Sequence, residues 1–290
     1  MAIKNEVWTI GSIIKWTEQY FQDKGVDSPR LDAEVLLSHV LQKERIYLYI
    51  HFDEPLEAAE LAAFREMVKK RVQRIPVAYI VGAREFMGLR FAVSPAVLIP
   101  RPDTEILVEA VIERLKDKSQ IKFVDIGTGS GAIVLSLLHY LPLACAVAVD
   151  ISQDALAVAT ENAETLLVKD RVDFYQGDLY EPLAAEKFDA IVSNPPYIPN
   201  ADIAELEPEV KEFEPYGALA GGLDGLDFYR RLIADGSEHL KDGGFMAFEV
   251  GINQAQVVAA IAESVPTFGQ TQIIKDYAGI ERVVILYKNK

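Results

Sequence analysis

Apolar positions in the first eighty residues recur at helical spacing, which predicts a helical region. One helix is expected over residues 8–24, where Gly25 ends it. A second begins at Ser28-Pro29 and continues through residue 40, because serine favours the N-cap and proline the first turn. A third is expected over residues 55–74. This region contains neither a glycine-rich turn nor a catalytic cluster, so it is expected to serve recognition.

The pattern changes after Pro76. Residues 79–82 and 86–93 are predicted to form short strands around a turn, because they are rich in β-branched and aromatic side chains. We interpret them as a hairpin linker. A helix is then expected over residues 105–116.

Strands and helices alternate from Ile121 onward. Strands are expected at residues 122–126, 144–149, 172–176, 189–193, 244–250, 271–276 and 282–287. Helices are expected between most of them, at residues 131–140, 153–166, 226–240 and 252–264. This alternation predicts an α/β fold with a mostly parallel sheet covered on both faces. Only residues 277–280 separate the last two strands, so the final strand is expected to be antiparallel.

Composition narrows the class of protein. The 290 residues carry 29 basic and 44 acidic side chains, a net charge of −15. This balance disfavours direct nucleic-acid binding, which depends on neutralising phosphates. The single cysteine, Cys145, excludes an intramolecular disulfide and is expected to be a buried strand residue. With no signal-peptide pattern and no apolar run of membrane-spanning length, we expect a cytoplasmic protein without a membrane partner.

A glycine-rich turn follows the first strand of the alternating region. Gly127, Gly129 and Gly131 have the spacing Gly-x-Gly-x-Gly after Asp125-Ile126. Glycines let the backbone bend sharply and let a ligand approach it closely. The next strand ends at Asp150, whose carboxylate can accept hydrogen bonds from both hydroxyls of a ribose. A simple tight turn remains the alternative.

The third strand of this region is followed by Asp178 and Leu179. Asp178 can accept a hydrogen bond from the exocyclic amine of adenine while Leu179 packs on the ring, although Asp125 and Asp178 could instead only cap turns. Acidic side chains at successive strand ends disfavour a phosphate-rich ligand. A nucleoside with a positive centre fits better, and S-adenosylmethionine has that chemistry.

The fourth strand of the region leads into Asn194-Pro195-Pro196-Tyr197. Adjacent prolines hold the backbone extended, so the Asn194 side-chain oxygen and the Pro195 carbonyl can accept both hydrogens of one –NH2 group. Tyr197 can stack on the planar group held there. An ordinary turn is the alternative.

This pattern suits methyl transfer to an amide or aromatic amine. The lone pair of such a nitrogen is delocalised, and two acceptors can orient the nitrogen so that positioning and electrostatics supply most of the catalysis. No strong general base is needed. The histidines are scattered and lack metal-ligand spacing, so we expect neither a catalytic histidine nor a metal; they are His39, His51, His139 and His239.

The glycine turn and the Asn-Pro-Pro-Tyr motif resemble those of S-adenosylmethionine-dependent amino-methyltransferases. Further motifs make the chain similar, over nearly its whole length, to the release factor glutamine methyltransferase family. These motifs are Pro76-Val77-Ala78-Tyr79-Ile80, Phe91-Ala92-Val93-Ser94-Pro95, Leu98-Ile99-Pro100-Arg101-Pro102-Asp103-Thr104-Glu105, Phe213-Glu214-Pro215 with Ala218-Leu219, and Asp276-Tyr277 through Glu281-Arg282-Val283.

The resemblance implies a class I S-adenosylmethionine-dependent methyltransferase, Rossmann-like, with a mostly parallel seven-stranded sheet whose last strand is antiparallel. Residues 1–84 would be an N-terminal helical substrate-recognition domain, 85–98 the hairpin linker and 99–290 the methyltransferase domain. The implied reaction methylates N5 of the glutamine in the Gly-Gly-Gln motif of class 1 peptide chain release factors, and S-adenosylhomocysteine is the product. Such a protein would serve translation termination.

The resemblance also implies site residues. The cofactor would be bound by Gly127, Thr128, Gly129, Ser130, Gly131, Asp150, Asp178, Leu179 and Asn194. The catalytic and substrate-binding residues would be Asn194, Pro195, Pro196 and Tyr197. Arg101-Pro102-Asp103-Thr104 would lie near the methionine end of the cofactor, and Leu179 stands where the family often has a bulkier residue.

Three alternatives stay open. Nucleic-acid amino-methyltransferases also use Asn-Pro-Pro-Tyr, but they usually need a basic track for phosphates. A nonenzymatic nucleoside-binding module would not need the intact Asn-Pro-Pro-Tyr motif. A dinucleotide-dependent oxidoreductase is disfavoured because the glycine spacing differs from Gly-x-Gly-x-x-Gly.

Overall fold

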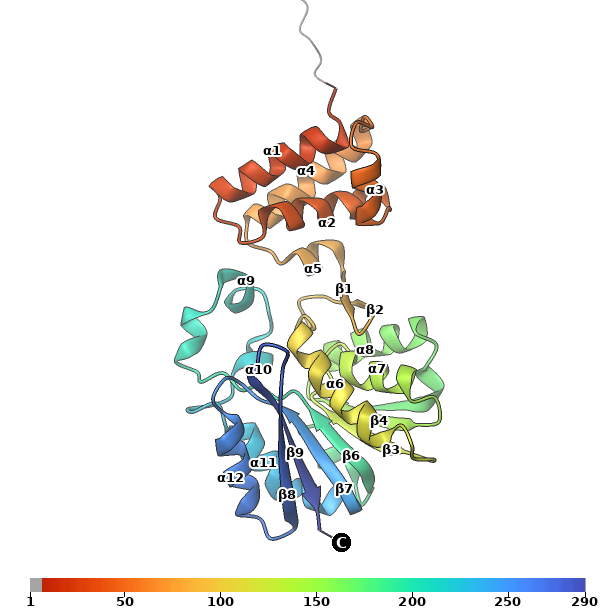
Figure 1. Cartoon of the computed structure of the whole chain (residues 1–290), viewed down its shortest axis with the longest axis vertical. Helices are drawn as coiled ribbons and strands as arrows, with labels where there is room; N and C mark the ends of the chain where they lie inside the picture. The colour runs from red at the N-terminus through yellow and green to blue at the C-terminus, as the bar shows by residue number, and fades with distance from the viewer. Residues whose placement is uncertain (1–6, 290) are drawn as a thin grey trace, which may run out of the picture. The chain divides into compact units, whose positions relative to one another are not determined.

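A computed structural model describes residues 7–289, which divide into two compact units. The first, here called the helical unit, contains the described residues up to Gly82 together with Pro208–Phe213. The second, the sheet unit, contains residues 83–207 and those from Glu214 onward. Figure 1 shows helices in the first and a central sheet in the second.

The helical unit encloses its own apolar core. Phe21, Leu36, Leu37 and Phe64 are buried together. Thr9 begins the first helix, because its side chain and that of Ser12 form a reciprocal capping box. The unit contains helices α1 (Ile10–Asp23), α2 (Pro29–Leu41), α3 (Arg45–Ile50), α4 (Ala58–Val72), α5 (Val77–Val81) and α9 (Pro208–Lys211).

One expected element in the helical unit is wrong. The strand expected at residues 79–82 is helix α5. A short apolar run does not distinguish a strand from a helix by periodicity. Here Pro76, with φ −54°, precedes the helix, and Gly82, with φ +72°, ends it in the left-handed conformation. Helix α3 was also not expected from the sequence.

A buried ionic cluster connects α2, α4 and α9 inside the helical unit. Nε of Arg71 lies 2.7 Å from Oδ2 of Asp32, and its Nη1 lies 2.8 Å from Oε1 of Glu209. Arg74 also contacts Glu209, at 3.0 Å. These contacts explain why Pro208–Phe213, which comes from the middle of the sheet unit's sequence, belongs to the helical unit.

The sheet unit is built on seven strands in the order β5-β4-β3-β6-β7-β9-β8. The last strand, β9, is antiparallel to both β7 and β8, and the pairs from β5 to β7 are parallel. The expected mostly parallel sheet with an antiparallel final strand is confirmed. The strands are β3 (Lys122–Ile126), β4 (Cys145–Asp150), β5 (Val172–Gln176), β6 (Phe188–Ser193), β7 (Leu240–Glu249), β8 (Phe268–Lys275) and β9 (Glu281–Lys288).

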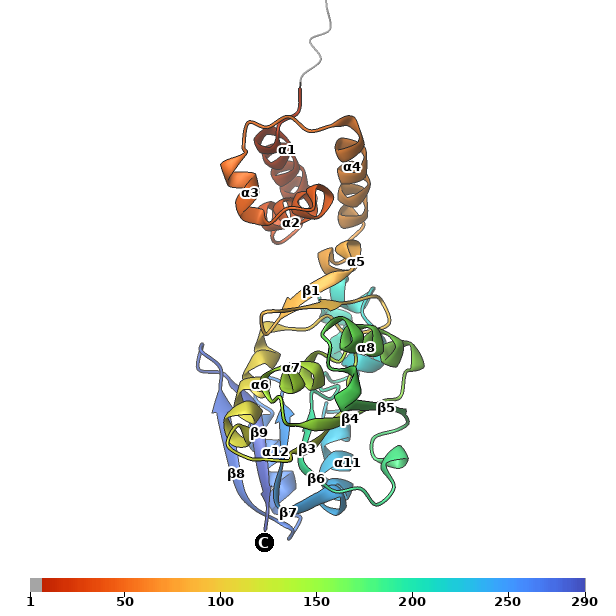
Figure 2. The same cartoon turned by 90° about the vertical axis from the view of Figure 1, so that its right-hand side faces the viewer.

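Helices cover both faces of this sheet, as Figure 2 shows from the side. Alternate residues of β3 enter different cores: Phe123 joins the cluster with α6 and α7, whereas Val124 joins the cluster with α11 and α12. The helices are α6 (Pro102–Leu115), α7 (Ala132–Tyr140), α8 (Gln153–Thr165), α10 (Tyr216–Leu219), α11 (Asp227–Gly236) and α12 (Ala255–Glu263), with 3-10 turns η1 (Lys169–Arg171), η2 (Glu181–Leu183), η3 (Asp202–Glu205) and η4 (Ser237–His239).

The hairpin is part of the sheet unit. Its strands are β1 (Ala83–Phe86) and β2 (Leu89–Ala92), so it begins before the linker boundary expected at residue 85. Phe86 and Phe91 are buried in the core that contains α6 and α7. The hairpin therefore packs on the sheet unit rather than forming an independent connection.

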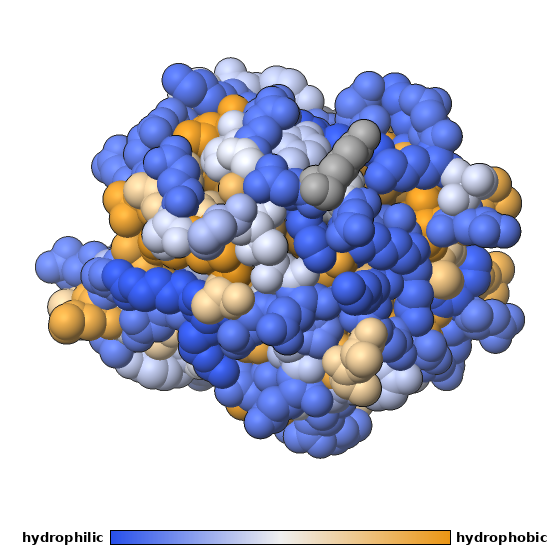
Figure 3. Space-filling model, turned by 90° about the horizontal axis from the view of Figure 1, so that it is seen from below, coloured by the Kyte–Doolittle hydropathy of each residue, from blue (hydrophilic) through white to orange (hydrophobic). Residues whose placement is uncertain are grey.

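Cys145 is exposed, which corrects the expectation of a buried cysteine. It is the first residue of β4, and it is exposed between two buried residues, Ala144 and Ala146. In Figure 3, hydrophilic residues cover most of the visible surface and hydrophobic ones form small scattered groups. Within residues 7–289 no helix has the length and apolarity needed to cross a membrane.

Candidate active site

A pocket of about 440 Å³ lies where β3, β4, β5 and β6 end. Ligands of open parallel sheets bind at this edge, because the carboxyl ends of the strands and their loops meet there. Every lining residue belongs to the sheet unit. The lining comes from within segments 96–104, 126–133, 149–155, 177–179, 193–196 and 215–231.

The glycine turn forms one wall of the pocket. Gly127 and Gly129 have φ of +75° and +56°, values that disfavour side chains, and a Cβ at either would meet nothing within 4 Å. The Gly127 and Thr128 amides donate to the Val149 carbonyl, at 2.8 and 3.0 Å, which fixes the turn to β4. A ligand can therefore approach this backbone directly.

Asp125 supports the glycine turn from beneath. Its carboxylate is buried and accepts a hydrogen bond from the Thr128 hydroxyl at 2.7 Å. Burial raises the pKa of Asp125 to about 7, partly opposed by the Thr128 hydrogen bond. Asp125 is not part of the pocket lining, so it stabilises the turn rather than contacting the ligand.

Asp150 projects into the pocket from the end of β4. Its Oδ2 accepts from the Gly129 amide at 2.8 Å and its Oδ1 from the Ser152 amide at 2.9 Å. A carboxylate has about four lone-pair sites, so two remain for a ligand's hydroxyl groups. The structure thus brings Asp150 and the glycine turn together in the lining of one pocket.

Asp178 and Leu179 line the pocket after β5. Oδ2 of Asp178 is paired with the Arg231 guanidinium at 2.6 Å, a partner that the sequence did not indicate. Leu179 has φ +52°, an uncommon conformation for a branched residue, and such strain concentrates at functional sites. Arg231 therefore shares with Asp178 the part of the pocket where adenine is expected.

Asn194, Pro195 and Pro196 form the opposite wall. Nδ2 of Asn194 donates to Oγ1 of Thr104 at 3.2 Å, which leaves the Asn194 side-chain oxygen as the available acceptor. Before it, the Ser193 hydroxyl donates to the Ile126 carbonyl at 2.6 Å and joins the ends of β6 and β3. This hydrogen bond fixes the glycine turn and the Asn-Pro-Pro-Tyr segment relative to each other.

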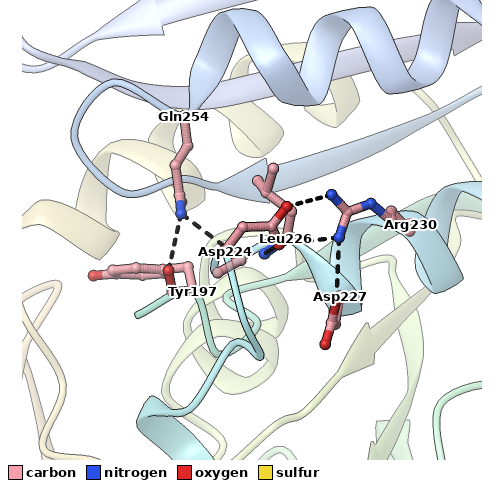
Figure 4. Close-up of polar contacts among 7 residues, drawn as sticks. Tyr197, Asp224, Leu226, Asp227, Arg230 and Gln254 are labelled. Atoms are coloured by element: carbon pink, nitrogen blue, oxygen red, sulfur yellow. Dashed lines mark hydrogen bonds and ion pairs between the residues drawn. The ribbon is translucent and has the colours of Figure 1, made fainter. Parts of the chain in front are cut away.

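Tyr197 is outside the pocket lining, although the sequence suggested that it stacks there. Its hydroxyl lies 3.4 Å from Oε1 of Glu249. Its carbonyl accepts from Nε2 of Gln254 at 2.9 Å, and Figure 4 shows Gln254 reaching Tyr197 from the neighbouring loop. Burial raises the pKa of Tyr197 well above its usual value, so its hydroxyl stays protonated and acts as a donor.

Two glycines press against the Asn-Pro-Pro-Tyr backbone. A Cβ at Gly221 would lie 2.8 Å from the Pro196 carbonyl oxygen, and one at Gly225 would lie 2.2 Å from that of Tyr197. Arg230 pairs with Asp224 and Asp227 and braces this loop (Figure 4). The run Gly221-Gly222-Leu223-Asp224-Gly225 was the available sequence signal for this support, and our sequence reasoning missed it.

Glu214 clamps the segment that precedes α6. Its buried carboxylate accepts from the Ile99 amide at 3.1 Å and pairs with Arg101. Pro100, Arg101 and Thr104 line the pocket, at the place expected for the methionine end of a cofactor. The sequence singled out the Phe213-Glu214-Pro215 motif, but only the structure shows that Glu214 contacts Ile99 and Arg101.

Glu249, at the end of β7, was also missed by the sequence reasoning. Its side chain is buried behind Thr104 and Tyr197. Burial raises the pKa of Glu249 to about 7. A continuous buried run that ends in a glutamate gives little indication of this contact in the sequence.

The pocket residues fit S-adenosylmethionine. The open backbone at Gly127 and Gly129 accommodates a closely bound ligand, and Asp150 offers acceptors for a ribose. The lining guanidinium groups, Arg101 and Arg231, are both paired with carboxylates. This donor set suits a nucleoside with a positive centre better than a phosphorylated one.

Comparisons with known proteins agree with this geometry. Residues 12–82 match the family described as PrmC N-terminal domain, and residues 102–206 match Methyltransferase small domain. A protein of Geobacter sulfurreducens named release factor glutamine methyltransferase is 46% identical, over 98% of both chains. One of the same name from Rhodopirellula baltica is 43% identical, over 97% of both.

Solved structures support the fold alone. A methyltransferase from Pyrococcus furiosus superposes with a TM-score of 0.53 at 18% identity, covering 77% of this chain and 100% of that one. The catalytic domain of hMettl16, solved with an RNA hairpin, gives 0.57 at 16% identity, covering 76% and 81%.

Proposed function

The chain belongs to the release factor glutamine methyltransferase family, and on that premise we propose that it transfers a methyl group from S-adenosylmethionine to a release factor glutamine. The acceptor atom is the side-chain amide nitrogen, N5, of the Gly-Gly-Gln motif in class 1 peptide chain release factors. The single observation that carries this proposal is the carboxamide of Asn194, whose amide group is engaged by Thr104 and whose oxygen is left as an acceptor in the pocket.

The cofactor half of the pocket supports the use of S-adenosylmethionine. Gly127, Gly129 and Asp150 would hold its nucleoside, and Leu179 would pack on the adenine. When bound, this cofactor supplies a methyl group on a positively charged sulfur. The chain's own residues would fix the orientation of the bound cofactor. The two arginines of the lining, Arg101 and Arg231, are already paired with carboxylates and so would not favour a phosphorylated ligand.

The Asn-Pro-Pro-Tyr half supports an amide substrate. The Asn194 side-chain oxygen and the Pro195 carbonyl would accept both hydrogens of the glutamine –NH2 group, which orients the nitrogen for reaction. Two fixed acceptors also stabilise the positive charge that develops on nitrogen as the new bond forms. The carboxylates of Asp125 and Glu249 are outside the lining, so neither is placed to take the proton that the nitrogen loses.

The helical unit would contact the release factor away from the glutamine. Helix α3 exposes three large apolar side chains within one and a half turns, and contiguous exposed apolar groups often mark protein contacts. These are Ile46, Tyr49 and Ile50, with exposed fractions of 60%, 50% and 70%. Release factors act in translation, so a cytoplasmic location is part of the proposal.

Mass spectrometry of a purified release factor, incubated with the protein and S-adenosylmethionine, tests the function. The expected result is a gain of one methyl group on the glutamine of the Gly-Gly-Gln peptide. Total RNA treated in parallel is the comparison. Methylated adenine or guanine with an unmodified release factor would overturn the proposal in favour of a nucleic-acid amino-methyltransferase.

A further inference from the structure

Helix α11 contributes a part of the pocket wall that the sequence reasoning did not assign. Phe228 and Arg231 both line the pocket. They are three residues apart in one helix, so they lie on the same face. Tyr229, Leu232 and Ile233 of this helix are instead buried in the core. Helix α11 therefore presents an aromatic ring and a guanidinium group to the ligand.

These two side chains meet the segment that follows β5. Nη2 of Arg231 lies 2.6 Å from Oδ2 of Asp178. The next residue, Leu179, packs against the same core cluster as Phe228. Asp150, where a ribose is expected, ends the neighbouring strand β4. A base attached to that ribose would therefore meet apolar side chains from both segments and the Asp178 carboxylate.

The backbone of Asp178 is fixed, but its side chain depends on Arg231. The Gly177 amide donates to the Asp150 carbonyl at 3.0 Å, and the Glu181 amide donates to the Asp178 carbonyl at 3.2 Å. The Asp178 side chain is 38% exposed, so water competes for its oxygens. The ion pair with Arg231 is the contact that restricts the orientation of the carboxylate.

This ion pair contributes little to the stability of the fold, because both side chains are partly exposed to water. Its place in the pocket gives it a different use. A carboxylate has two oxygens, so pairing through Oδ2 is compatible with a ligand donor on Oδ1. A carboxylate that is held before the ligand arrives also loses less entropy on binding, which increases affinity.

We propose that Arg231 is a positioning residue that holds Asp178 toward the 6-amino group of adenine, so that the pair determines the base specificity of the cofactor site. This inference rests on the proposed use of S-adenosylmethionine. The 6-amino group of adenine donates hydrogen bonds, whereas the 6-oxo group of hypoxanthine only accepts them. A fixed carboxylate at that edge of the base favours the first and repels the second.

Isothermal titration calorimetry with S-adenosylhomocysteine and S-inosylhomocysteine tests the proposal, because the two compounds differ only in the base. The parent should bind the adenosyl compound about 10- to 100-fold more tightly, the scale of a hydrogen bond to a charged group. Arg231→Met should reduce this preference to about threefold or less, because the carboxylate is no longer held in advance.

Two results with Arg231→Met would overturn the proposal. An unchanged preference would show that Arg231 does not position Asp178. An increased preference would show that Arg231 itself donates to the 6-oxo group of the inosyl compound. Either result is read directly from the ratio of the two dissociation constants, which a general loss of stability in α11 would not change.

Arg230→Met is the matched control. Arg230 is the neighbouring residue of α11 and is 47% exposed, against 49% for Arg231. It pairs with Asp224 and Asp227 (Figure 4) and is outside the pocket lining. Its preference for the adenosyl compound should equal that of the parent. An equal loss of preference in both variants would assign the effect to α11 as a whole and overturn the role of Arg231.

A double variant tests whether Arg231 acts through Asp178. Asp178→Asn should itself lose most of the preference, and adding Arg231→Met should cause no further loss. Additive losses would contradict the positioning role. If Arg231→Met fails to fold in circular dichroism, Asp178→Asn still decides, because a preference like that of the parent would remove Asp178 from the base site.

The outcomes separate this inference from the proposed function. A parent protein that binds neither compound and leaves a release factor unmodified would contradict the proposed cofactor and function. A parent that methylates the release factor but binds both compounds equally would contradict the base-specificity inference alone.

Discussion

The two walls of the pocket are built in different ways. At the glycine turn on the cofactor side, the contacts join residues close in sequence: Asp125 and Thr128 are 3 apart, and Gly129 and Asp150 are 21 apart. On the amide side, Asn194 and Thr104 are 90 apart. The first wall is a local motif between two adjacent strands, whereas the second assembles from loops that only the complete sheet brings together.

This difference predicts separable effects. Changes in the wall formed by the glycine turn and Asp150 should alter cofactor affinity. Turnover should be less sensitive to them, because this wall forms from the two adjacent strands β3 and β4 alone. Changes in the assembled wall should alter turnover, because its acceptors must be held in place by distant supports. The following substitutions probe that separation.

Asn194→Ala should give the largest effect. It removes the side-chain acceptor for the substrate nitrogen, and loss of one such group typically lowers kcat by about 10²- to 10³-fold. Cofactor binding should stay nearly intact. Turnover assays on a release factor and isothermal titration calorimetry with S-adenosylmethionine provide the two measurements. A parallel loss of both would show that the walls are not independent.

Gly225→Ala should come next, with about a 100-fold loss of kcat on the scale of a reacting group displaced by 1 Å. Its Cβ would lie 2.2 Å from the Tyr197 carbonyl oxygen and would push the backbone of the motif. Gly243→Ala is the matched control, because Gly243 has φ +73° against +76° at Gly225 but no neighbour within 4 Å. If both variants lose activity equally, backbone strain rather than displacement of Tyr197 is responsible.

Asp150→Ala should weaken S-adenosylmethionine binding by about 1–3 kcal/mol, the scale of hydrogen bonds to a charged group. At saturating cofactor its turnover should approach that of the parent. Calorimetry and saturation kinetics check the two halves of this expectation. An unchanged dissociation constant would remove Asp150 from the cofactor site.

The smallest effect is expected on helix α3. Ile46→Ser combined with Ile50→Ser should lower kcat/KM for a folded release factor about tenfold, corresponding to about 1.4 kcal/mol of lost contact. Cofactor affinity should not change. Leu143→Ser is the control. Leu143 is 74% exposed and precedes β4, so it lies at the amino-terminal end of that strand, whereas the pocket lies at the carboxyl end. An equal loss of kcat/KM in the α3 double variant and in Leu143→Ser would argue against a docking role for α3.

Sequence alone determined the features that depend on local physics. Alternating strands and helices specified the mostly parallel sheet, and the short final connection specified the antiparallel last strand. Gly127, Gly129 and Asp150 were identifiable as pocket residues, because glycine backbone freedom and a position at a strand end both indicate a ligand pocket. The helix at Val77–Val81 was missed because five apolar residues carry too little periodicity.

Only the tertiary structure decided the remaining features. Arg231 beside Asp178, Glu214 beneath Ile99, and Gln254 on the Tyr197 carbonyl are long-range pairs without a spacing rule. The same holds for Thr104 beside Asn194 and for Glu249 beside Tyr197. These pairs form because burial excludes water as a hydrogen-bond partner. Each buried polar group is therefore paired with a polar group that the packed sheet and its loops bring beside it.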